Sequence, residues 1–435
     1  MLSQTLLSCL STFESCFTAP SYRRFVTLMS GWLLCVEKRT VTGVMRASGV
    51  ASEDPSGYHR FFSRGAWSPD DVGRRLLSLA LKLVPGKGRV MLTLDDTLAR
   101  HTGKHIASAG MHRDALLSTA AKPFFHFGHS WVVLAIAVTL PFGKTLSLPF
   151  LTRLYRTPKD ACRRGLAHTK RTVLAAQMLV ELVRYERTRR FLVLADNAYM
   201  NRSIVRALPE TVDILGRGRL DAALYAPAPE YGGLGRPRVK GERVKSPAER
   251  AATETFASID VCISGRPATV QVLTFDALWY IVGASRLMRF VVFRGWPGHA
   301  KDDVWVSTDL NLGAAEIIET YCQRWSIEET FGWVKSRLGF EDPHNRTEHA
   351  VHRTAPMALW AYSLVVLCYA DWASRRQVLP FRSGSWYRTK TTPSFSDMLA
   401  VLRRQCWSIW VSDQASRGRL DQKSLAPLLD IVGYG

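Results

Sequence analysis

The segment VMLTLDD, residues 90–96, is a short apolar run that ends in two carboxylates. A second apolar run, FLVLA at residues 191–195, also stops at a carboxylate, Asp196. Both runs are typical of short buried strands bounded by polar residues. Taken alone, each aspartate is better explained as the cap of a strand or helix. Together they predict an α/β fold in which two strand ends place Asp95 and Asp196 side by side.

The rest of the chain alternates between helical and strand-like patterns. Short amphipathic helices are expected before residue 87, and strands at 131–140 and 145–150 precede a helix at 169–185. Further β-rich pieces lie at 256–263, 268–275 and 289–293, and the last helices at 312–340, 355–373 and 395–404. We therefore expect an all-α N-terminal domain at 1–86, an α/β core at 87–215 and 311–372, a β-rich insertion at 216–310, and a helical C-terminal region at 373–435.

The composition favours a polyanionic partner. The 435 residues contain 58 Lys and Arg against 37 Asp and Glu, a formal net charge of +21. This balance suits nucleic acid, although ribosomal and membrane-surface proteins share it. Eight widely spaced cysteines without a C-x-x-C pair argue against a zinc module or a disulfide framework, and for a reduced, cytoplasmic protein. No signal peptide is evident, and the apolar stretch at 356–373 is expected to form a buried helix rather than a membrane span.

The segment AAEIIETYCQRWSIEETFGWVKSRLGF, residues 314–340, carries the sharpest pattern. If it forms one continuous helix, four polar side chains share a stripe roughly 60° wide, directly beside the apolar face. These side chains are Tyr321, Arg324, Glu328 and Lys335. Glu329 lies about 100° further round, toward solvent. We therefore predict Glu328, at the edge of the core, as the acid that joins Asp95 and Asp196.

Basic residues elsewhere are candidate DNA contacts. Residues 39–67 are compatible with a helix-turn-helix whose second helix carries Arg60 and Arg64, and an ordinary helical bundle with a basic face explains them equally well. In the β-rich insertion, Arg238 and Lys240 belong to a basic run that suits a long DNA footprint. Each of these side chains taken singly is also compatible with a solvated surface position.

The pattern Y-x2-R-x3-E-x6-K resembles the signature helix of a large group of bacterial insertion-sequence DDE transposases, and all four positions match. The D-x-T at Asp95 and the D-x-x-Y at Asp196 also resemble that group, which favours Asp95 over Asp96 as the ligand. The resemblance covers roughly residues 89–372. It implies a ribonuclease-H-like catalytic core that a β-strand domain interrupts before Glu328, and N-terminal helices that bind DNA ends.

The resemblance also implies a chemistry. Asp95, Asp196 and Glu328 would bind two Mg²⁺ or Mn²⁺ ions, while Tyr321, Arg324 and Lys335 would position the DNA end beside them. The expected enzyme is a transposase that binds terminal inverted repeats, cuts and transfers DNA strands through a hairpin intermediate, and acts as a homodimer on target DNA. Its flipped base would stack on an aromatic side chain of the insertion, for which Trp296 is the candidate, with a merely buried tryptophan as the alternative.

Two competing functions keep the same fold. One is a nuclease that hydrolyses DNA without strand transfer, and the other is a non-catalytic DNA-binding protein derived from a transposase. The complete helix pattern and the three acids favour catalysis over the second of these. In each case the expected location is the bacterial cytoplasm, at the nucleoid, without a membrane partner.

Overall fold

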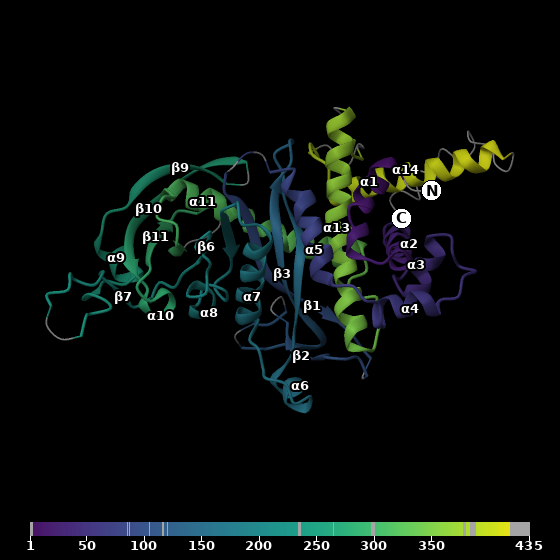
Figure 1. The fold of residues 1–435 in the computed structure, drawn as a ribbon. Coiled ribbons are helices and arrows are strands. Elements are labelled where there is room, and N and C mark those ends of the chain that lie inside the picture. The colour runs from purple at the N-terminus through teal and green to yellow at the C-terminus, as the bar shows by residue number, and fades with distance from the viewer. Residues whose placement is uncertain are drawn as a thin grey trace.

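The computed structural model describes residues 3–417 except 85, 87, 104, 115–116, 120, 234–235, 264, 297–300, 377–379 and 383–388. The chain is a mixed α/β protein whose described strands form one sheet of 12 strands (Figure 1). The strands are β1 (Val90–Arg100), β2 (Gly110–Arg113), β3 (Phe125–Thr139), β4 (Thr145–Tyr155), β5 (Phe191–Ala195), β6 (Val212–Arg217), β7 (Leu224–Tyr225), β8 (Arg243–Val244), β9 (Ala257–Ile263), β10 (Arg266–Leu278), β11 (Leu287–Arg294) and β12 (Asp303–Ser307).

The helices divide between the N-terminal segment, the crossovers of the sheet and the C-terminal third. They are α1 (Gln4–Ser11), η1 (Glu14–Cys16), α2 (Ala19–Leu34), α3 (Val41–Ala47), α4 (Ser56–Ser63), α5 (Pro69–Leu81), α6 (Pro158–Arg163), α7 (Arg171–Tyr185), α8 (Arg202–Val205), α9 (Pro247–Thr253), α10 (Tyr280–Gly283), α11 (Ala314–Cys322), η2 (Gln323–Trp325), α12 (Ser326–Arg337), α13 (Glu348–Arg376) and α14 (Phe395–Ser416). Parts of the predicted C-terminal region lie outside the described residues.

One half of the sheet is formed by β4, β3, β1, β5 and β6, in that spatial order. Strand β3 runs antiparallel to both β1 and β4, whereas β5 is parallel to β1 and to β6. Residues 191–195 are buried throughout, as expected for a strand with neighbours on both sides. Because β1 and β5 are parallel, the stretch over which they pair ends at Leu94 and Ala195, which lie side by side.

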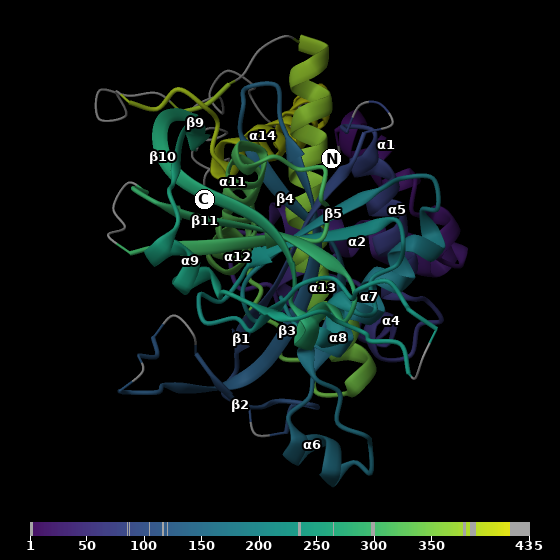
Figure 2. The same ribbon diagram turned by 90° about the vertical axis from the view of Figure 1, so that its left-hand side faces the viewer.

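The β-rich region at 216–310 continues this sheet. Strand β12 pairs antiparallel with β6, and β11, β10 and β9 follow from it. The strands expected at 256–263, 268–275 and 289–293 are β9, β10 and β11. Their inner face has an apolar cluster of its own, which includes Trp305 and Tyr321. Figure 2 shows these strands curving around α11, which carries Tyr321.

Helix α13 connects the sheet with the N-terminal helices. Figure 1 shows it standing between the sheet and α1 to α4. By length and composition α13 would be able to cross a membrane, but 72% of its apolar window is buried within the protein. The expectation of a buried helix at this position is therefore confirmed. Its core is continuous with that of the sheet, since one apolar cluster extends from Leu6 through Trp131 to Cys406.

Two of the expected element boundaries that were wrong affect the site. Strand β1 does not end at its carboxylates but continues to Arg100, because β3 pairs with it as far as Gly128. The expected continuous helix at 312–340 is instead α11, the 3₁₀ turn η2 and α12. The hydroxyl of Ser326 donates to the carbonyl of Gln323 at 2.7 Å, a local side-chain bond that competes with the regular helical pattern.

Candidate active site

Asp95 and Asp196 occupy equivalent positions on neighbouring parallel strands. In the pairing between β1 and β5, the last two partners are Leu94 and Ala195. Asp95 and Asp196 follow them immediately. Burial, together with the negative charges of Asp196 and Asp96, raises the pKa of Asp95 to about 7. Burial also raises the pKa of Asp196. The two carboxylates therefore form a partly buried pair of like charges, as their positions after two apolar runs predict.

Asp96 has a different environment from Asp95, because successive side chains of a strand point to opposite faces. Its carboxylate accepts a hydrogen bond from the Tyr199 hydroxyl at 2.8 Å and from the Ser130 hydroxyl at 3.4 Å. Arg171, the first residue of α7, lies 3.4 Å from the same carboxylate. Asp96 is thus held by protein partners on the α7 side, which supports Asp95 as the functional acid.

Glu328 lies in the first turn of α12, and Arg324 connects it to Asp95. The Arg324 Nη2 atom lies 2.6 Å from Glu328 Oε1, and its Nη1 atom lies 3.4 Å from Asp95 Oδ2. Only 13% of the Arg324 side chain is exposed. Its positive charge also acts on Asp196, whose pKa it lowers against the larger effect of burial. Arg324 is therefore the shared counter-charge of all three predicted acids.

The neighbouring residue Glu329 is turned away from this cluster. Its carboxylate lies 3.1 Å from the ammonium of Lys144, in the turn between β3 and β4. Lys335, the last residue of the predicted stripe, is half-buried about 10 Å further along α12. Burial lowers the pKa of Lys335, and the nearest charges acting on it are those of Glu341, Arg100 and Asp114. Lys335 therefore places a positive charge further along α12, away from the three predicted acids.

A chain of buried hydroxyl groups fixes the start of α12. Thr93 Oγ1 on β1 lies 2.7 Å from Ser147 Oγ on β4, which lies 2.6 Å from Ser326 Oγ. The Thr330 hydroxyl donates to the Ser147 carbonyl at 2.9 Å. Glu328 is positioned relative to Asp95 through these contacts. The sequence analysis missed them, because a serine in an apolar strand gives no sign of its partner.

An aromatic cavity of about 830 Å³ opens beside the acids. Its lining includes Asp196, Arg324, Trp296, Trp305, Tyr321 and Trp325. The Tyr321 ring packs on Trp305 at 4.4 Å between centroids, so Tyr321 is a buried wall residue rather than part of a polar stripe. Trp296 is half-buried against Phe293 and Trp305. Trp325 is 61% exposed, and no pattern in the sequence analysis singled it out.

The other predicted DNA contacts lie away from this cavity. Arg60 and Arg64 are exposed on α4 and directly after it, at the opposite end of the molecule from β7 (Figure 1). Arg238 is exposed in the loop between β7 and β8. Lys240 packs over two aromatic rings, at 3.4 Å from Tyr225 and 4.8 Å from Tyr280, so its ammonium has a structural partner.

The donor chemistry of the site fits divalent Mg²⁺ or Mn²⁺, which prefer carboxylate oxygens. Buried carboxylates with a raised pKa mark a place where added positive charge is stabilising. In the part of the chain that the structure describes, no three His, Cys, Asp or Glu side chains are gathered closely enough to hold an ion. Arg324 lies between Asp95 and Glu328, so these two carboxylates reach a common ion only after the guanidinium has moved.

An α/β sheet with two partly buried carboxylates side by side, beside an aromatic and basic cavity, is an arrangement suited to a nucleic-acid-cleaving enzyme. Residues 12–271 match the family model described as DDE superfamily endonuclease. The chain therefore belongs to the DDE superfamily of endonucleases. The match ends before Glu328, so the prediction of Glu328 as a site residue depends on its ion pair with Arg324 and on the Y-x2-R-x3-E-x6-K pattern.

A curated relative agrees with this assignment. The chain is 36% identical over 87 residues to the probable transposase for insertion sequence element IS5377 of Geobacillus stearothermophilus. The aligned region covers 20% of this chain and 22% of that protein, so the chain matches about a fifth of the relative's length. The family match and this relative together confirm the resemblance to insertion-sequence DDE transposases.

Proposed function

We propose that this protein is a DNA transposase that binds the terminal inverted repeats of an insertion sequence, cuts the DNA at the element ends and transfers the strands to a target. The observation that carries the proposal is that Arg324 contacts both Asp95 and Glu328 and lines the same cavity as Asp196. The central strand order β4, β3, β1, β5, β6, with β1, β5 and β6 parallel, supports a ribonuclease-H-like core.

Each residue of the site has a role in this proposal. Asp95, Asp196 and Glu328 would hold two Mg²⁺ or Mn²⁺ ions, which would activate water or a 3′-hydroxyl and stabilise the leaving oxygen. Arg324 exchanges its carboxylate partners for a DNA phosphate, to which its planar guanidinium can donate two parallel hydrogen bonds. Lys335 holds a phosphate further along the strand as a point charge. These contacts position the DNA and do not read its sequence.

The aromatic cavity suits an extruded base and so supports cut-and-paste transposition through a hairpin. A tightly bent DNA end leaves a base unpaired, and aromatic rings bind such a base by stacking. In this proposal the base stacks on Trp296, while Tyr321 and Trp305 form the wall of the cavity behind Trp296. The cavity adjoins Asp196 and Arg324, so a base stacked there would lie next to the reacting phosphate.

The rest of the molecule provides a long DNA footprint, in keeping with the net charge of +21. The N-terminal segment at 1–86 binds the element ends and presents Arg60 and Arg64. Arg238 contributes from the β-rich insertion, and Lys240 from its position over two tyrosine rings. Two copies of the chain form a homodimer that bridges both element ends.

The test is cleavage of a supercoiled plasmid that carries both ends of the native element, in the presence of Mg²⁺. We expect the wild type to release the element and Glu328→Ala to bind the ends without cutting them. Glu329→Ala is the matched control, because Glu329 pairs with Lys144 outside the site and should keep activity. Equal cutting by wild type and Glu328→Ala would show that the site is misplaced.

The same assay separates the competing functions. Nicking without strand-transfer product would favour a nuclease of the same fold. Binding without cleavage by every variant, including the wild type, would favour a non-catalytic DNA-binding protein.

A further inference from the structure

The β2–β3 hairpin exposes an unusual concentration of apolar side chains. In the described part of the chain, Met111, Leu117, Phe124 and Phe125 are 40–56% exposed, although large apolar residues are otherwise mostly buried. Figure 2 shows β2 and the adjoining end of β3 reaching outward from the body of the sheet. Exposed apolar side chains gathered in one place mark an interaction surface.

Two cationic side chains lie next to the two phenylalanine rings of this hairpin. Arg113 is the direct cross-strand partner of Phe125, and the Lys122 ammonium lies 5.3 Å from the centre of the Phe124 ring. Both cationic side chains belong to exposed residues. The acidic residue nearby, Asp114, is buried and lies 3.0 Å from both Arg100 and His126. A partner that is anionic and also offers flat apolar surface fits this pattern, and duplex DNA has both properties.

The hairpin and the candidate active site lie along the same strand, β3. Asp95 pairs with Val133 on β3, and Phe125 lies eight residues before Val133 on the same strand. At about 3.4 Å per residue this separation is roughly 27 Å, or about 8 base pairs of B-DNA. Lys335 is near the hairpin, because the charges of Arg100, beside its base, and of Asp114, at the start of its loop, act on it. A DNA end held at the carboxylates would therefore pass the hairpin.

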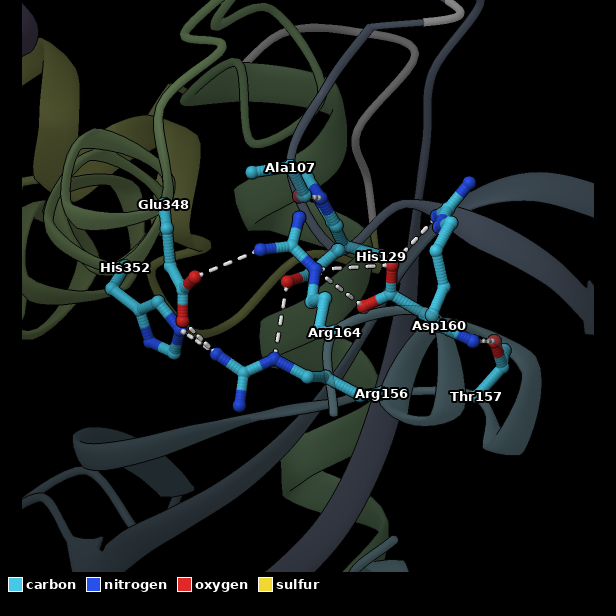
Figure 3. A network of polar contacts seen from close by, with 10 residues as sticks. Ala107, His129, Arg156, Thr157, Asp160, Arg164, Glu348 and His352 are labelled. Carbon is cyan, nitrogen blue, oxygen red and sulfur yellow. Dashed lines mark hydrogen bonds and ion pairs between the residues drawn. The ribbon is translucent and has the colours of Figure 1, made fainter. Parts of the chain in front are cut away.

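The base of the hairpin is held by the polar network of Figure 3. Glu348, at the start of α13, forms ion pairs with Arg156 and Arg164, and the Arg156 Nε atom donates to the Ser108 hydroxyl at 3.1 Å. The His129 Nε2 atom donates to the Ala107 carbonyl at 2.8 Å. Residues 107–109 lead directly into β2, so these bonds fix the direction in which the hairpin projects.

We propose that the β2–β3 hairpin is a second DNA-binding element, which packs Phe124 and Phe125 into the minor groove about 8 base pairs inside the cleaved end. Arg113 and Lys122 bind the phosphates on either side. This inference rests on the proposed function, since it takes the DNA to be bound at the carboxylates. It adds a contact that acts through apolar packing and is independent of the metal site.

The experiment measures the affinity of the full chain for a labelled duplex of about 40 base pairs that carries one native element end, long enough to span the hairpin and the carboxylates. Phe124→Ser/Phe125→Ser should bind about 10- to 100-fold more weakly, the range expected from the loss of aromatic contacts to bases. The control is Leu7→Ser/Ile409→Ser, which removes two apolar side chains of similar exposure on α1 and α14. The control should bind within about twofold of the wild type, because surface substitutions away from a contact have small effects.

A second variant separates charge from apolar packing. Arg113→Gln should lower the slope of log affinity against log salt by about one, whereas Phe124→Ser/Phe125→Ser should leave the slope unchanged. Unaltered affinity of the double variant would overturn the inference. So would loss of dimer in sedimentation with unchanged DNA affinity, which would identify a second copy as the partner. If the plasmid assay still distinguishes wild type from Glu328→Ala, the proposed function survives either failure.

Discussion

Replacing Asp95 by asparagine should stabilise the metal-free protein while it abolishes the proposed catalysis. The pKa of Asp95 is raised from 3.8 to about 7, mainly by burial and then by Asp196 and Asp96. A folded-state pKa above the unfolded value means that the charged carboxylate disfavours folding. The penalty is absent below about pH 4 and complete above about pH 7. At about 1.36 kcal/mol per pKa unit it reaches roughly 4 kcal/mol.

The raised pKa already includes the attraction of Arg324, and the magnitude is an upper value because burying the polar amide of an asparagine also costs free energy. Arg324 keeps its 2.6 Å contact with Glu328, and an asparagine oxygen can still accept the bond that the Asp96 backbone N–H donates at 2.8 Å. We therefore expect Asp95→Asn to raise the free energy of unfolding by about 1–4 kcal/mol at about pH 8 with EDTA.

Urea denaturation at about pH 8 tests this expectation, first with EDTA and then with Mn²⁺ in excess. The wild type should gain stability with Mn²⁺ and the variant should gain little, because a ligand stabilises only the state that binds it. Asp96→Asn is the matched control and should lose stability in both buffers, since Asp96 is held by Tyr199 and Arg171. The reasoning would be refuted by an Asp95→Asn variant that is less stable than wild type in EDTA.

Three further substitutions test the scaffold by urea denaturation. Ser147→Ala should cost about 1–3 kcal/mol and reduce cleavage, because it removes the buried link between Thr93 and Ser326. Burial would raise the pKa of Asp397, but hydrogen bonds from Arg382, Lys390 and Ser394 lower it to about 2. Asp397→Asn should therefore lose roughly 2 kcal/mol at about pH 7, and the difference should vanish as the pH falls from about 4 to 2. Arg403→Met should cost about 3 kcal/mol, since two carbonyl groups at the end of α2 lose a charged donor.

The sequence predicted the parts of the fold that depend on local pattern. The apolar run at 191–195 is strand β5 with the expected bounds, and the side-by-side placement of Asp95 and Asp196 follows from its parallel pairing with β1. Where β1 ends was not predictable, because its extension to Arg100 depends on pairing with β3. The strands β6 and β12 were not identified, since each is short and is defined by its neighbours in the sheet.

The candidate site shows the same division between local and long-range information. The spacing of Arg324 and Glu328 predicted that they share a face, and they form an ion pair four residues apart. Nothing in the local pattern indicated that Tyr321 would pack against Trp305 of β12. The partner of Ser326 was equally hidden, because Ser147 lies 179 residues away in the chain.

The break between α11 and α12 positions a positive charge among the predicted acids. Asp95 and Asp196 are partly buried like charges that repel each other, and an unpaired buried charge costs several kcal/mol. A counter-charge within the protein reduces this cost when neither DNA nor metal is bound. The 3₁₀ turn Gln323–Trp325 places the Arg324 guanidinium within reach of both Asp95 and Glu328. Because a guanidinium binds phosphate as readily as carboxylate, the same side chain can leave the acids when a DNA phosphate enters the site.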